Sequence, residues 1–480
     1  MNWKLCISKV VLPSLLLAWI IAFFAHLGWK PGFAYNAQRY FEIFLMGCVL
    51  CAGVTMPVQY QFGRFWARSC SALLLLTLLV VWYADNLWLA VREALQYLAL
   101  FAAILVVAKT REQSGTKSFD QAVFFGLTVF CFGCSLIVLE GLLLSLSIQM
   151  VDQRIIFGAF VNVRTFAALQ IMTLLIMPAA WLTANSVGRQ RFIGVVAIIW
   201  WGLLLFTGTR AALIALPIPL IVLALIAGRD SLEWFKVLSV QFLGGVVVFI
   251  GLRLGNAWIL GASFWAEGGM SFARASTGGR LDLWHDAWIH FLEQPWFGNG
   301  PGAFACFTSE LVATPHNLVF QLLSEWGIFF SSLSIALALF IFVSMVRGLR
   351  RVFRQSPLHF SLFTSVVAVV VASMVDGVII GPLQQMVLVL IFGWTLHAFS
   401  AEKFTFLEAS SGNWIQVPKF GLLVTFLAVV LWGVDKDLQL QKELLVSPDG
   451  TVNLSYGPRF WADGHDRCSD WHERYENRNR

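Results

Sequence analysis

Arginine residues recur at the ends of the apolar runs and in the long polar segment between them. A guanidinium presents a fixed fork of donors that matches two oxygens of a phosphate, and it stays charged at every physiological pH. Several arginines converging at the depth of lipid headgroups predict a polyanionic ligand. The alternative is that each arginine snorkels to the membrane interface or pairs with a lipid phosphate. The candidates are Arg154, Arg164, Arg210, Arg253, Arg274 and Arg280.

Arg210 is the candidate that snorkelling explains least well. The stretch FTGTRAALIAL contains no acidic residue and places Arg210 at the start of an apolar helix. A charge in such a place is costly unless it has a partner or a function, so we predict a functional role for Arg210. For Arg154, Arg253 and Arg274 the interfacial alternative is favoured.

His316 precedes a long apolar helix in the stretch TPHNLVFQLLSEWG. A histidine can take up or release a proton near neutral pH, so His316 is a candidate general base or phosphate partner. Interfacial histidines such as His26 and His397 are usually structural. The position of His316 directly after an arginine-bearing segment sets it apart.

The composition shows which elements must hold these residues. Hydrophobic residues make up 58% of the chain and charged residues 12%, with a mean hydropathy of +0.75, whereas soluble proteins have about 25% charged residues. Apolar runs long enough to cross a bilayer recur throughout, which predicts an all-α polytopic membrane protein of about 12 or 13 transmembrane helices. We expect one membrane domain over 1–434 and a short tail over 435–480. The expected spans are 10–27, 40–57, 70–85, 87–108, 121–147, 166–184, 192–208, 210–227, 236–254, 318–346, 359–376, 382–400 and 419–434.

The Lys and Arg residues in the short loops indicate the orientation, because positive charge is retained on the cytoplasmic side. With the N-terminus inside and the first apolar run an uncleaved anchor, the segments 28–39, 148–165 and 255–316 and the tail lie outside. We therefore expect a multi-pass inner-membrane protein whose working face lies on the outer side. The net charge of +6 then reflects membrane topology and not a nucleic-acid partner.

The outer segment 255–316 is too long for a simple connector. Its stretch RLDLWHDAWIHFLE places Leu281, Trp284, Trp288 and Phe291 at helical spacing, which predicts an amphipathic helix lying on the membrane surface. The glycine-rich WFGNGPGAF that follows indicates a tight turn or a close approach of the backbone to a ligand.

The cysteines fall into two groups. The pairs Cys48/Cys51 and Cys131/Cys134 lie inside expected helices that lack nearby metal-binding partners, so we interpret them as packing residues and not as a metal site. Cys306 and Cys468 both lie on the expected outer side, where an oxidising compartment favours a disulfide between them. The alternative is that both thiols are free.

Four stretches together resemble the O-antigen ligase superfamily, which includes lipopolysaccharide O-antigen ligases, O-antigen polymerases and bacterial protein O-oligosaccharyltransferases. Their order and spacing, with the long outer segment between them, carry the resemblance. Phe330 departs from the family pattern, which has a second glycine there, three residues after the position of Gly327. The stretches are FVNVRTFAALQ at 160–170, TGTRAAL at 207–213, GGRLDLW at 278–284 with the QPWFGNGPGAF that follows it, and PHNLVFQLLSEWGIF at 315–329.

The resemblance implies transfer of a preassembled glycan from undecaprenyl diphosphate to an acceptor hydroxyl in the periplasm, without a metal or a cofactor. Arg210 and Arg280 would bind the diphosphate, and His316 would orient or deprotonate the acceptor or assist the leaving group. The sequence shows no carboxylate pair of the glycosidase kind, although Asp282 and Asp286 leave a carboxylate base open. The substrate-binding positions implied are Asn162, Arg164, Asp282, Asn317 and Asp376.

The acceptor is predicted from two further stretches. SMVDGVIIGPLQQ at 373–385 and YGPRFWADG at 456–464 resemble the pilin-modifying branch, so we favour a Ser or Thr of a pilin-like protein over a lipid A core or a growing O-antigen. Asp376 has the structural alternative of a helix cap or of a carboxylate facing a water-filled cavity. Membrane lipids are the other expected partners. The alternative from another class is a flippase or transporter for a lipid-linked glycan, but the chain shows no internal repeat.

Overall fold

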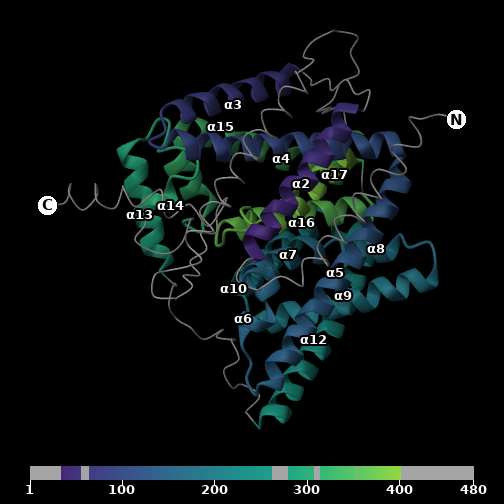
Figure 1. Cartoon of the computed structure of the whole chain (residues 1–480). Helices are drawn as coiled ribbons and strands as arrows, with labels where there is room; N and C mark the ends of the chain where they lie inside the picture. Colours follow the sequence, from purple (N-terminus) through teal and green to yellow (C-terminus); the bar gives the residue numbers. More distant parts are fainter. Residues whose placement is uncertain (1–33, 56–63, 262–278, 308–313, 353, 402–480) are drawn as a thin grey trace.

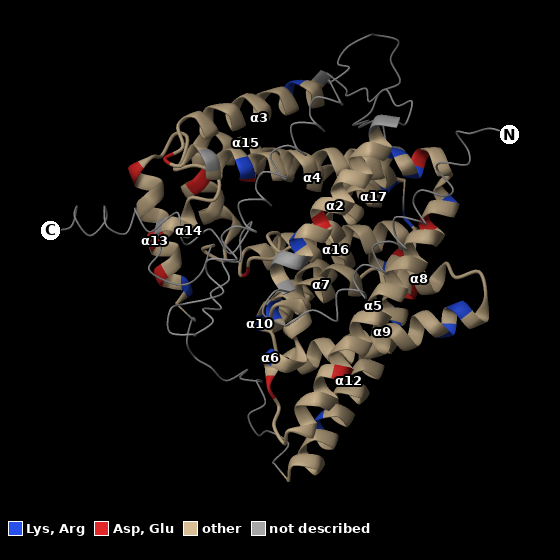
Figure 2. Ribbon diagram, viewed as in Figure 1, with Lys and Arg blue, Asp and Glu red and all other residues tan. Residues whose placement is uncertain are grey.

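The computed structural model describes residues 34–55, 64–261, 279–307, 314–352 and 354–401. Within these ranges the chain forms helices and turns and no strand, so the predicted all-α class is confirmed. Figure 2 shows that most of the ribbon carries uncharged residues and that the charged ones lie mainly near helix ends. The helices are α2 (Ala34–Thr55), α3 (Arg64–Trp82), α4 (Leu87–Ser114), α5 (Thr116–Ser147), α6 (Gln153–Ile156), η3 (Gly158–Phe160), α7 (Val163–Leu174), α8 (Met177–Leu182), α9 (Val187–Thr207), α10 (Arg210–Ala215), α11 (Pro217–Ala227), η4 (Gly228–Ser231), α12 (Leu232–Leu260), α13 (Arg280–Glu293), α14 (Phe304–Phe307), α15 (Leu318–Arg351), α16 (Pro357–Ser373), α17 (Pro382–Ala398) and η5 (Phe399–Ala401).

Six helical stretches in the described part of the chain are long and apolar enough to cross a membrane, which makes this a multi-pass membrane protein. Every expected span between residues 40 and 400 coincides with one of the described helices or helix pairs. The expected spans 10–27 and 419–434 lie outside the described residues, so the total of 12 or 13 stays a prediction. The six stretches are Phe65–Trp82, Leu89–Ser114, Thr116–Ser147, Val187–Thr207, Arg210–Leu260 and Leu318–Arg351.

Two expected spans are interrupted where a proline follows. The span 166–184 divides into α7 and α8, with Pro178 in the first turn of α8, and the span 210–227 divides into α10 and α11, with Pro217 opening α11. Proline lacks the backbone N–H that a continuous helix needs, and its ring crowds the preceding turn. The breaks keep α7 and α10 short and leave their first residues close to the surface of the protein.

The centre of the molecule is formed by α7, α16 and α17, with α2, α4, α5, α8 and α9 around them (Figure 1). Every residue of α7 from Phe166 to Leu174 is buried. Further out, α9 and α12 approach each other closely through glycines. A Cβ added at Gly245 would lie 2.3 Å from the Cβ of Trp201, and one added at Gly202 would lie 2.6 Å from Val248 Cγ1. Small residues that bring helix backbones together are the usual means of packing in a membrane.

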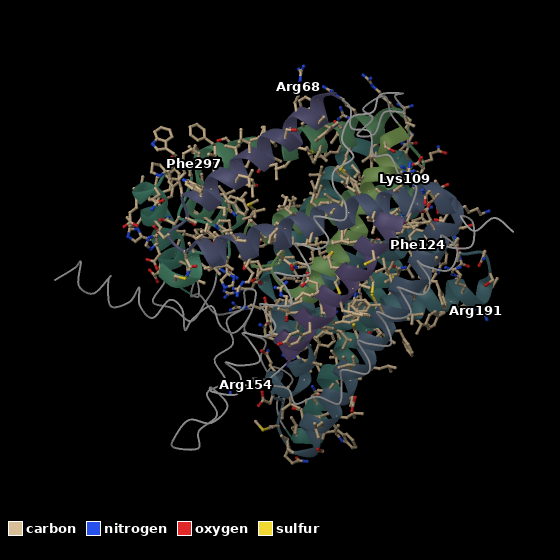
Figure 3. All side chains as sticks on the ribbon, turned by 45° about the horizontal axis from the view of Figure 1, so that its top comes forward. Arg68, Lys109, Phe124, Arg154, Arg191 and Phe297 are labelled. Carbon is tan, nitrogen blue, oxygen red and sulfur yellow. The ribbon has the colours of Figure 1, made fainter. Side chains whose placement is uncertain are left out.

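The molecule has two ends that carry different residues. In Figure 3, Lys109 and Arg191 lie toward one side, and Arg154 and Phe297 lie toward the opposite side. We call the first side the far end and the second the site end. This separation agrees with the sequence-based expectation that the first two residues share one side of the membrane and the last two the other.

The predicted amphipathic helix is α13, which packs against α15 at the site end (Figure 1). Leu283 and Ala287 are buried, together with Phe291, whereas Leu281 and Trp288 of the predicted apolar face are exposed. The buried face packs on α15 and α14. Contact of the exposed apolar residues with a membrane surface stays a prediction. α12 also continues to Leu260, beyond residue 255, where the outer segment was expected to begin.

Candidate functional site

The start of α7 presents Arg164. Asn162 is the N-cap residue, and its Oδ1 accepts hydrogen bonds from the backbone N–H groups of Arg164 at 2.8 Å and Thr165 at 3.0 Å. Such a cap satisfies donors that have no partner within the helix. The cap holds Arg164 in the first turn of α7, and the side chain of Arg164 is exposed at the site end.

Arg210 and Arg280 each open a helix directly after a glycine-containing turn. Gly208 has φ +62° at the end of α9, and α10 then begins at Arg210; Gly279 has φ +73°, and α13 begins at Arg280. Glycine adopts this left-handed backbone without steric cost. α10 packs against both α7 and α16. Both arginine side chains are half-buried.

Electrostatic effects on Arg280 show that the three arginines are neighbours. Burial lowers the pKa of Arg280, Asp376 acts in the opposite direction, and the positive charges of Arg164 and Arg210 lower the pKa further. Charge interactions of this kind fade with distance and solvent screening. Residues from α7, α10 and α13 are therefore gathered around one carboxylate, although they are far apart in sequence.

That carboxylate faces the predicted histidine. The distance from His316 Nδ1 to Asp376 Oδ1 is 3.3 Å, and the two side chains are 17% and 12% exposed. Burial alone would raise the pKa of Asp376, but the adjacent His316 and then Arg164 outweigh it and hold that pKa below its usual range. Asp376 is therefore an anion at neutral pH, and it lies beside the imidazole of His316.

Asn317 brings these two residues together. It caps α15, with its Oδ1 accepting from Val319 N–H at 3.0 Å and from Phe320 N–H at 3.2 Å. Its Nδ2 donates to the carbonyl oxygen of Met374 at 3.0 Å, in the turn that leads to Asp376. One side chain thus ties the start of α15 to the end of α16. His316 itself has φ +52°, which a residue other than glycine adopts only when its surroundings enforce it.

The remaining candidates lie in different surroundings. Asp282 is exposed in the first turn of α13, and Asp286 is half-buried one turn later. Arg154 is exposed in α6, which lies at the site end. Arg253 is buried within α12, so the snorkelling interpretation does not describe it. Arg274 lies outside the described residues.

The glycine-rich stretch approaches a helix and not an open surface. Gly300 N–H donates to the carbonyl of Glu325 at 3.0 Å, and Asn299 N–H donates to that of Ser324 at 3.0 Å. At this point α15 is kinked by Gly327, which has φ +70°. A Cβ at Gly298 would lie 2.4 Å from the backbone carbon of Glu325. The sequence predicted either a tight turn or a close approach of the backbone to a ligand. In the structure the glycines form a tight turn that packs closely against α15.

Cys306 is disulfide-bonded, as expected for the outer side. The cysteines of the two CxxC pairs, and Cys70, are free. Cys468 lies outside the described residues, so its pairing with Cys306 stays a prediction.

Residues 193–333 match a protein-family model described as O-Antigen ligase. This part of the chain is similar to the O-antigen ligase family. The resemblance seen in the sequence motifs is thereby confirmed at the level of the superfamily, and it supports a glycosyltransferase-type enzyme with a ligase or polymerase type of role on lipid-linked glycans. No curated protein matches the chain.

The O-antigen ligase domain contains only part of the cluster. Arg210, Arg280 and His316 fall inside the matched residues, whereas Arg164 and Asp376 fall outside them. The latter two nevertheless act on Arg280 electrostatically. The site is therefore assembled from the matched region and from helices that precede and follow it in the chain.

Proposed function

We propose that the chain transfers a preassembled glycan from undecaprenyl diphosphate to an acceptor hydroxyl at the site end. The observation that carries the proposal is the 3.3 Å approach of His316 to Asp376, together with Arg280, which is near enough to Asp376, Arg164 and Arg210 to interact with all three charges. These residues together hold three guanidinium groups and one carboxylate. They favour a ligand with several negative charges, and the diphosphate of the donor has that character.

The proposed reaction is a direct displacement at the anomeric carbon. The acceptor oxygen forms a bond to that carbon while the bond to the diphosphate oxygen breaks, and the proton of the hydroxyl passes to His316. Because Nδ1 of His316 faces Asp376, the proton is taken by Nε2. The arginines stabilise the negative charge that develops on the departing diphosphate. The reaction inverts the anomeric configuration, and as written it uses no metal and no nucleotide sugar.

We place the site end in the periplasm of a bacterial inner membrane. The far end carries Lys109 and Arg191, and cytoplasmic loops carry an excess of Lys and Arg. The disulfide of Cys306 at the site end agrees with an oxidising compartment. The donor and the membrane lipids then reach the cluster laterally from the outer leaflet.

For the acceptor we favour a Ser or Thr of a pilin-like protein, on the resemblance of residues 373–385. The same stretch contains Asp376, so the acceptor-related motif lies beside the proposed general base. A lipid A core acceptor or a growing O-antigen would use the same cluster in the same way.

The test uses the purified full chain in detergent with an undecaprenyl diphosphate-linked glycan and type IV pilin. We expect pilin to gain the mass of the glycan, and the Arg280→Ala variant to give no product. Lipopolysaccharide is examined in cells that lack the protein. If lipopolysaccharide loses its glycan while pilin keeps it, the acceptor is the lipid A core. If no covalent product forms with either acceptor, and the chain instead moves the lipid-linked glycan across a membrane, the transferase proposal is wrong and the flippase alternative holds.

A further inference from the structure

A buried polar network lies directly beneath the turn that carries Asp376. Its centre is Arg39 in α2, whose side chain is 2% exposed. Arg39 Nη1 donates to Glu42 Oε2 at 2.5 Å and to Gln385 Oε1 at 2.6 Å. Arg39 Nη2 donates to the hydroxyl of Tyr35 at 2.9 Å and to the carbonyl oxygen of Ile380 at 3.1 Å. The guanidinium therefore connects α2 with the α16–α17 turn and with the first turn of α17.

Gln385 extends the network to the same turn. Its Nε2 donates to the carbonyl oxygen of Ile379 at 3.0 Å. The carbonyls of Ile379 and Ile380 are thus both bound from beneath, three and four residues after Asp376. Gln96 of α4 donates to Glu42 Oε1 at 2.9 Å and to Gln385 Oε1 at 3.3 Å, so a third helix supports the arrangement.

The neighbouring Gln384 connects α17 with the helix that presents Arg164. Its Nε2 donates to the carbonyl oxygen of Thr165 at 2.6 Å. A Cβ at Gly381 would lie 2.0 Å from Gln384 Oε1, so the glycine leaves the space that this amide occupies. The first turn of α17 is therefore linked to two parts of the site, the Asp376 turn and the start of α7.

Stability alone does not account for such a network. Glu42 is 0% exposed and Arg39 is 2% exposed, and burying an ion pair costs desolvation that its attraction often fails to recover. Apolar residues of similar volume would serve packing at least as well. The network fixes the orientation of the carbonyl groups of Ile379 and Ile380 in the α16–α17 turn through hydrogen bonds. Apolar side chains cannot make such bonds.

We propose that Arg39 is a positioning residue, which holds the α16–α17 turn so that Asp376 stays 3.3 Å from His316. The inference rests on the proposed function, because it assigns Arg39 to the transfer reaction through Asp376. Arg39 does not contact the substrate. It acts through the carbonyl of Ile380 and through Gln385.

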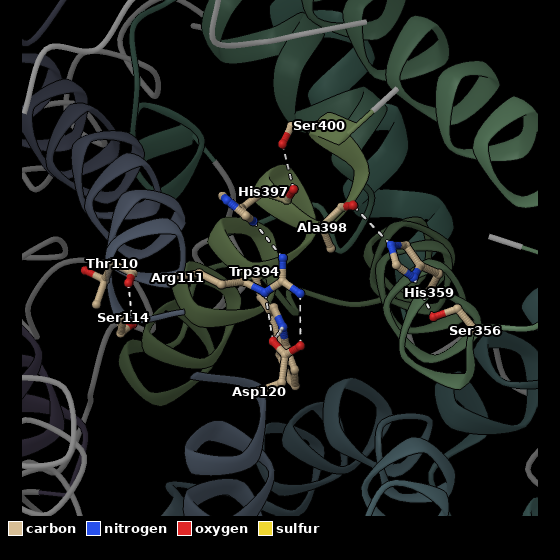
Figure 4. Close-up of polar contacts among 10 residues, drawn as sticks. All are labelled: Thr110, Arg111, Ser114, Asp120, Ser356, His359, Trp394, His397, Ala398 and Ser400. Carbon is tan, nitrogen blue, oxygen red and sulfur yellow. Dashed lines mark hydrogen bonds and ion pairs between the residues drawn. The ribbon is translucent and has the colours of Figure 1, made fainter. Parts of the chain in front are cut away.

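The test compares two charge-balanced double variants of the full chain. The first, Arg39→Gln with Glu42→Gln, removes the ion pair beneath the turn. The second is the far-end control, Arg111→Gln with Asp120→Asn, which removes a buried Arg–Asp pair away from the site (Figure 4). Each is measured in membranes of a deletion strain of the source organism, as the rate at which labelled glycan leaves the lipid-linked donor for the acceptor.

We expect the first variant to lower kcat about 10- to 100-fold, because a displaced catalytic group has an effect of that size. The KM for the lipid-linked donor changes less than about twofold, since the arginines that hold the diphosphate are intact. The far-end control keeps the kcat of the wild type per folded molecule. Adding Asp376→Asn to the first variant lowers kcat no further, whereas adding it to the control has its full effect, because only the first variant acts through Asp376.

Equal kcat in the two double variants would overturn the inference, as would a full additional loss from Asp376→Asn in the first variant. If the first variant does not fold, Gln385→Met replaces it, because this substitution removes the three hydrogen bonds of Gln385, to Arg39, Gln96 and Ile379, and leaves the Arg39–Glu42 pair in place. Arg280→Ala is measured alongside. If Arg280→Ala also retains transfer, the proposed function fails; if only the Arg39 variants retain it, the positioning role alone fails.

Discussion

The two ends of the molecule each hold a cluster built around arginine, and they are organised differently. At the far end, Arg111 binds both oxygens of Asp120, through Nε at 2.8 Å and Nη2 at 2.9 Å (Figure 4). Its Nη1 lies 2.6 Å from His397 Nδ1, and Trp394 donates to Asp120 at 2.7 Å. One positive charge meets one negative charge, with the Arg111 side chain 7% exposed.

At the site end, the charges of Asp376, Arg164 and Arg210 all act on Arg280. Arg164 is exposed, and Arg210 and Arg280 are half-buried. The named residues of this cluster keep an excess of positive charge and remain accessible, whereas the far-end pair is neutral and enclosed. The comparison teaches that the type of residue does not distinguish a binding site from a structural clamp. The balance of charge and the accessibility of the donors do.

The largest effect is expected from the arginines of the site end. Arg280→Ala and Arg210→Ala should each lower transfer by about 100-fold or more, because a preorganised donor to the developing charge is lost. Lysine at either position should restore transfer only in part, since a point charge does not reproduce bidentate contact with a phosphate. The assay is glycan transfer by purified variants whose insertion and folding are checked by size-exclusion chromatography. Full activity of both alanine variants would remove the diphosphate-binding role.

The second-largest effect is a loss of kcat at His316, which we compare with His397. His316→Ala should lower kcat by about 100-fold, as for the loss of a general base. His397→Ala, beside Arg111, should lower the melting temperature but keep kcat per folded molecule. Similar losses of kcat at both positions would leave His316 with a structural role only.

A smaller effect should come from Asn317, which both caps α15 and binds Met374. Asn317→Ser keeps a cap of similar strength but is too short to hold the carbonyl of Met374, so stability should change by less than about 1 kcal/mol. Transfer should fall about 10-fold, because His316 and Asp376 are no longer tied together. Asn86→Ser is the matched control, since Asn86 caps α4 with one bond to Leu89. Kinetics and thermal unfolding of both variants check the prediction, and equal transfer in the two would contradict it.

The smallest effect concerns the pH dependence of stability. The pKa of Asp376 is lower in the folded state than its ordinary value of 3.8. Its contribution to stability is therefore present above that value and is lost as the pH falls through the folded-state pKa. We expect the melting temperature of the wild type to exceed that of Asp376→Asn at pH 7, and the difference to shrink as the pH falls below about 4. A difference that grows toward low pH would show that the carboxylate is not stabilised by His316 and Arg164.

Much of the membrane fold and the principal site residues could be predicted from the sequence. The apolar runs predict the helices because the bilayer demands their length, and Arg210 stands out because a charge opens an apolar helix. The predicted roles of Arg280 and His316 rest more on the resemblance of their motifs to a family than on physical arguments. Their meeting with Arg164 and Asp376 requires the starts of α7, α10, α13 and α15 and the end of α16 to lie at one place, which no local pattern contains.

Arg39 shows where prediction from the sequence stops. Arg39 and Glu42 lie one turn apart at the edge of an expected span, which is also the pattern of an interfacial pair. Only packing of α2 against α4 and α17 places them beneath the Asp376 turn. The packing of α13 on α15 is likewise absent from any local pattern, and the kink at Gly327 that accommodates the glycine-rich stretch is a property of two segments together.

The central claim is that the site-end arginines bind the diphosphate of the donor. The most direct measurement is the affinity of the purified full chain for undecaprenyl diphosphate, compared between the wild type, Arg280→Gln and the far-end control. We predict that Arg280→Gln weakens binding about 10-fold or more, which is about 1.4 kcal/mol, and that the far-end control binds as tightly as the wild type. Equal affinities in all three proteins, or a loss confined to the far-end control, would contradict the account.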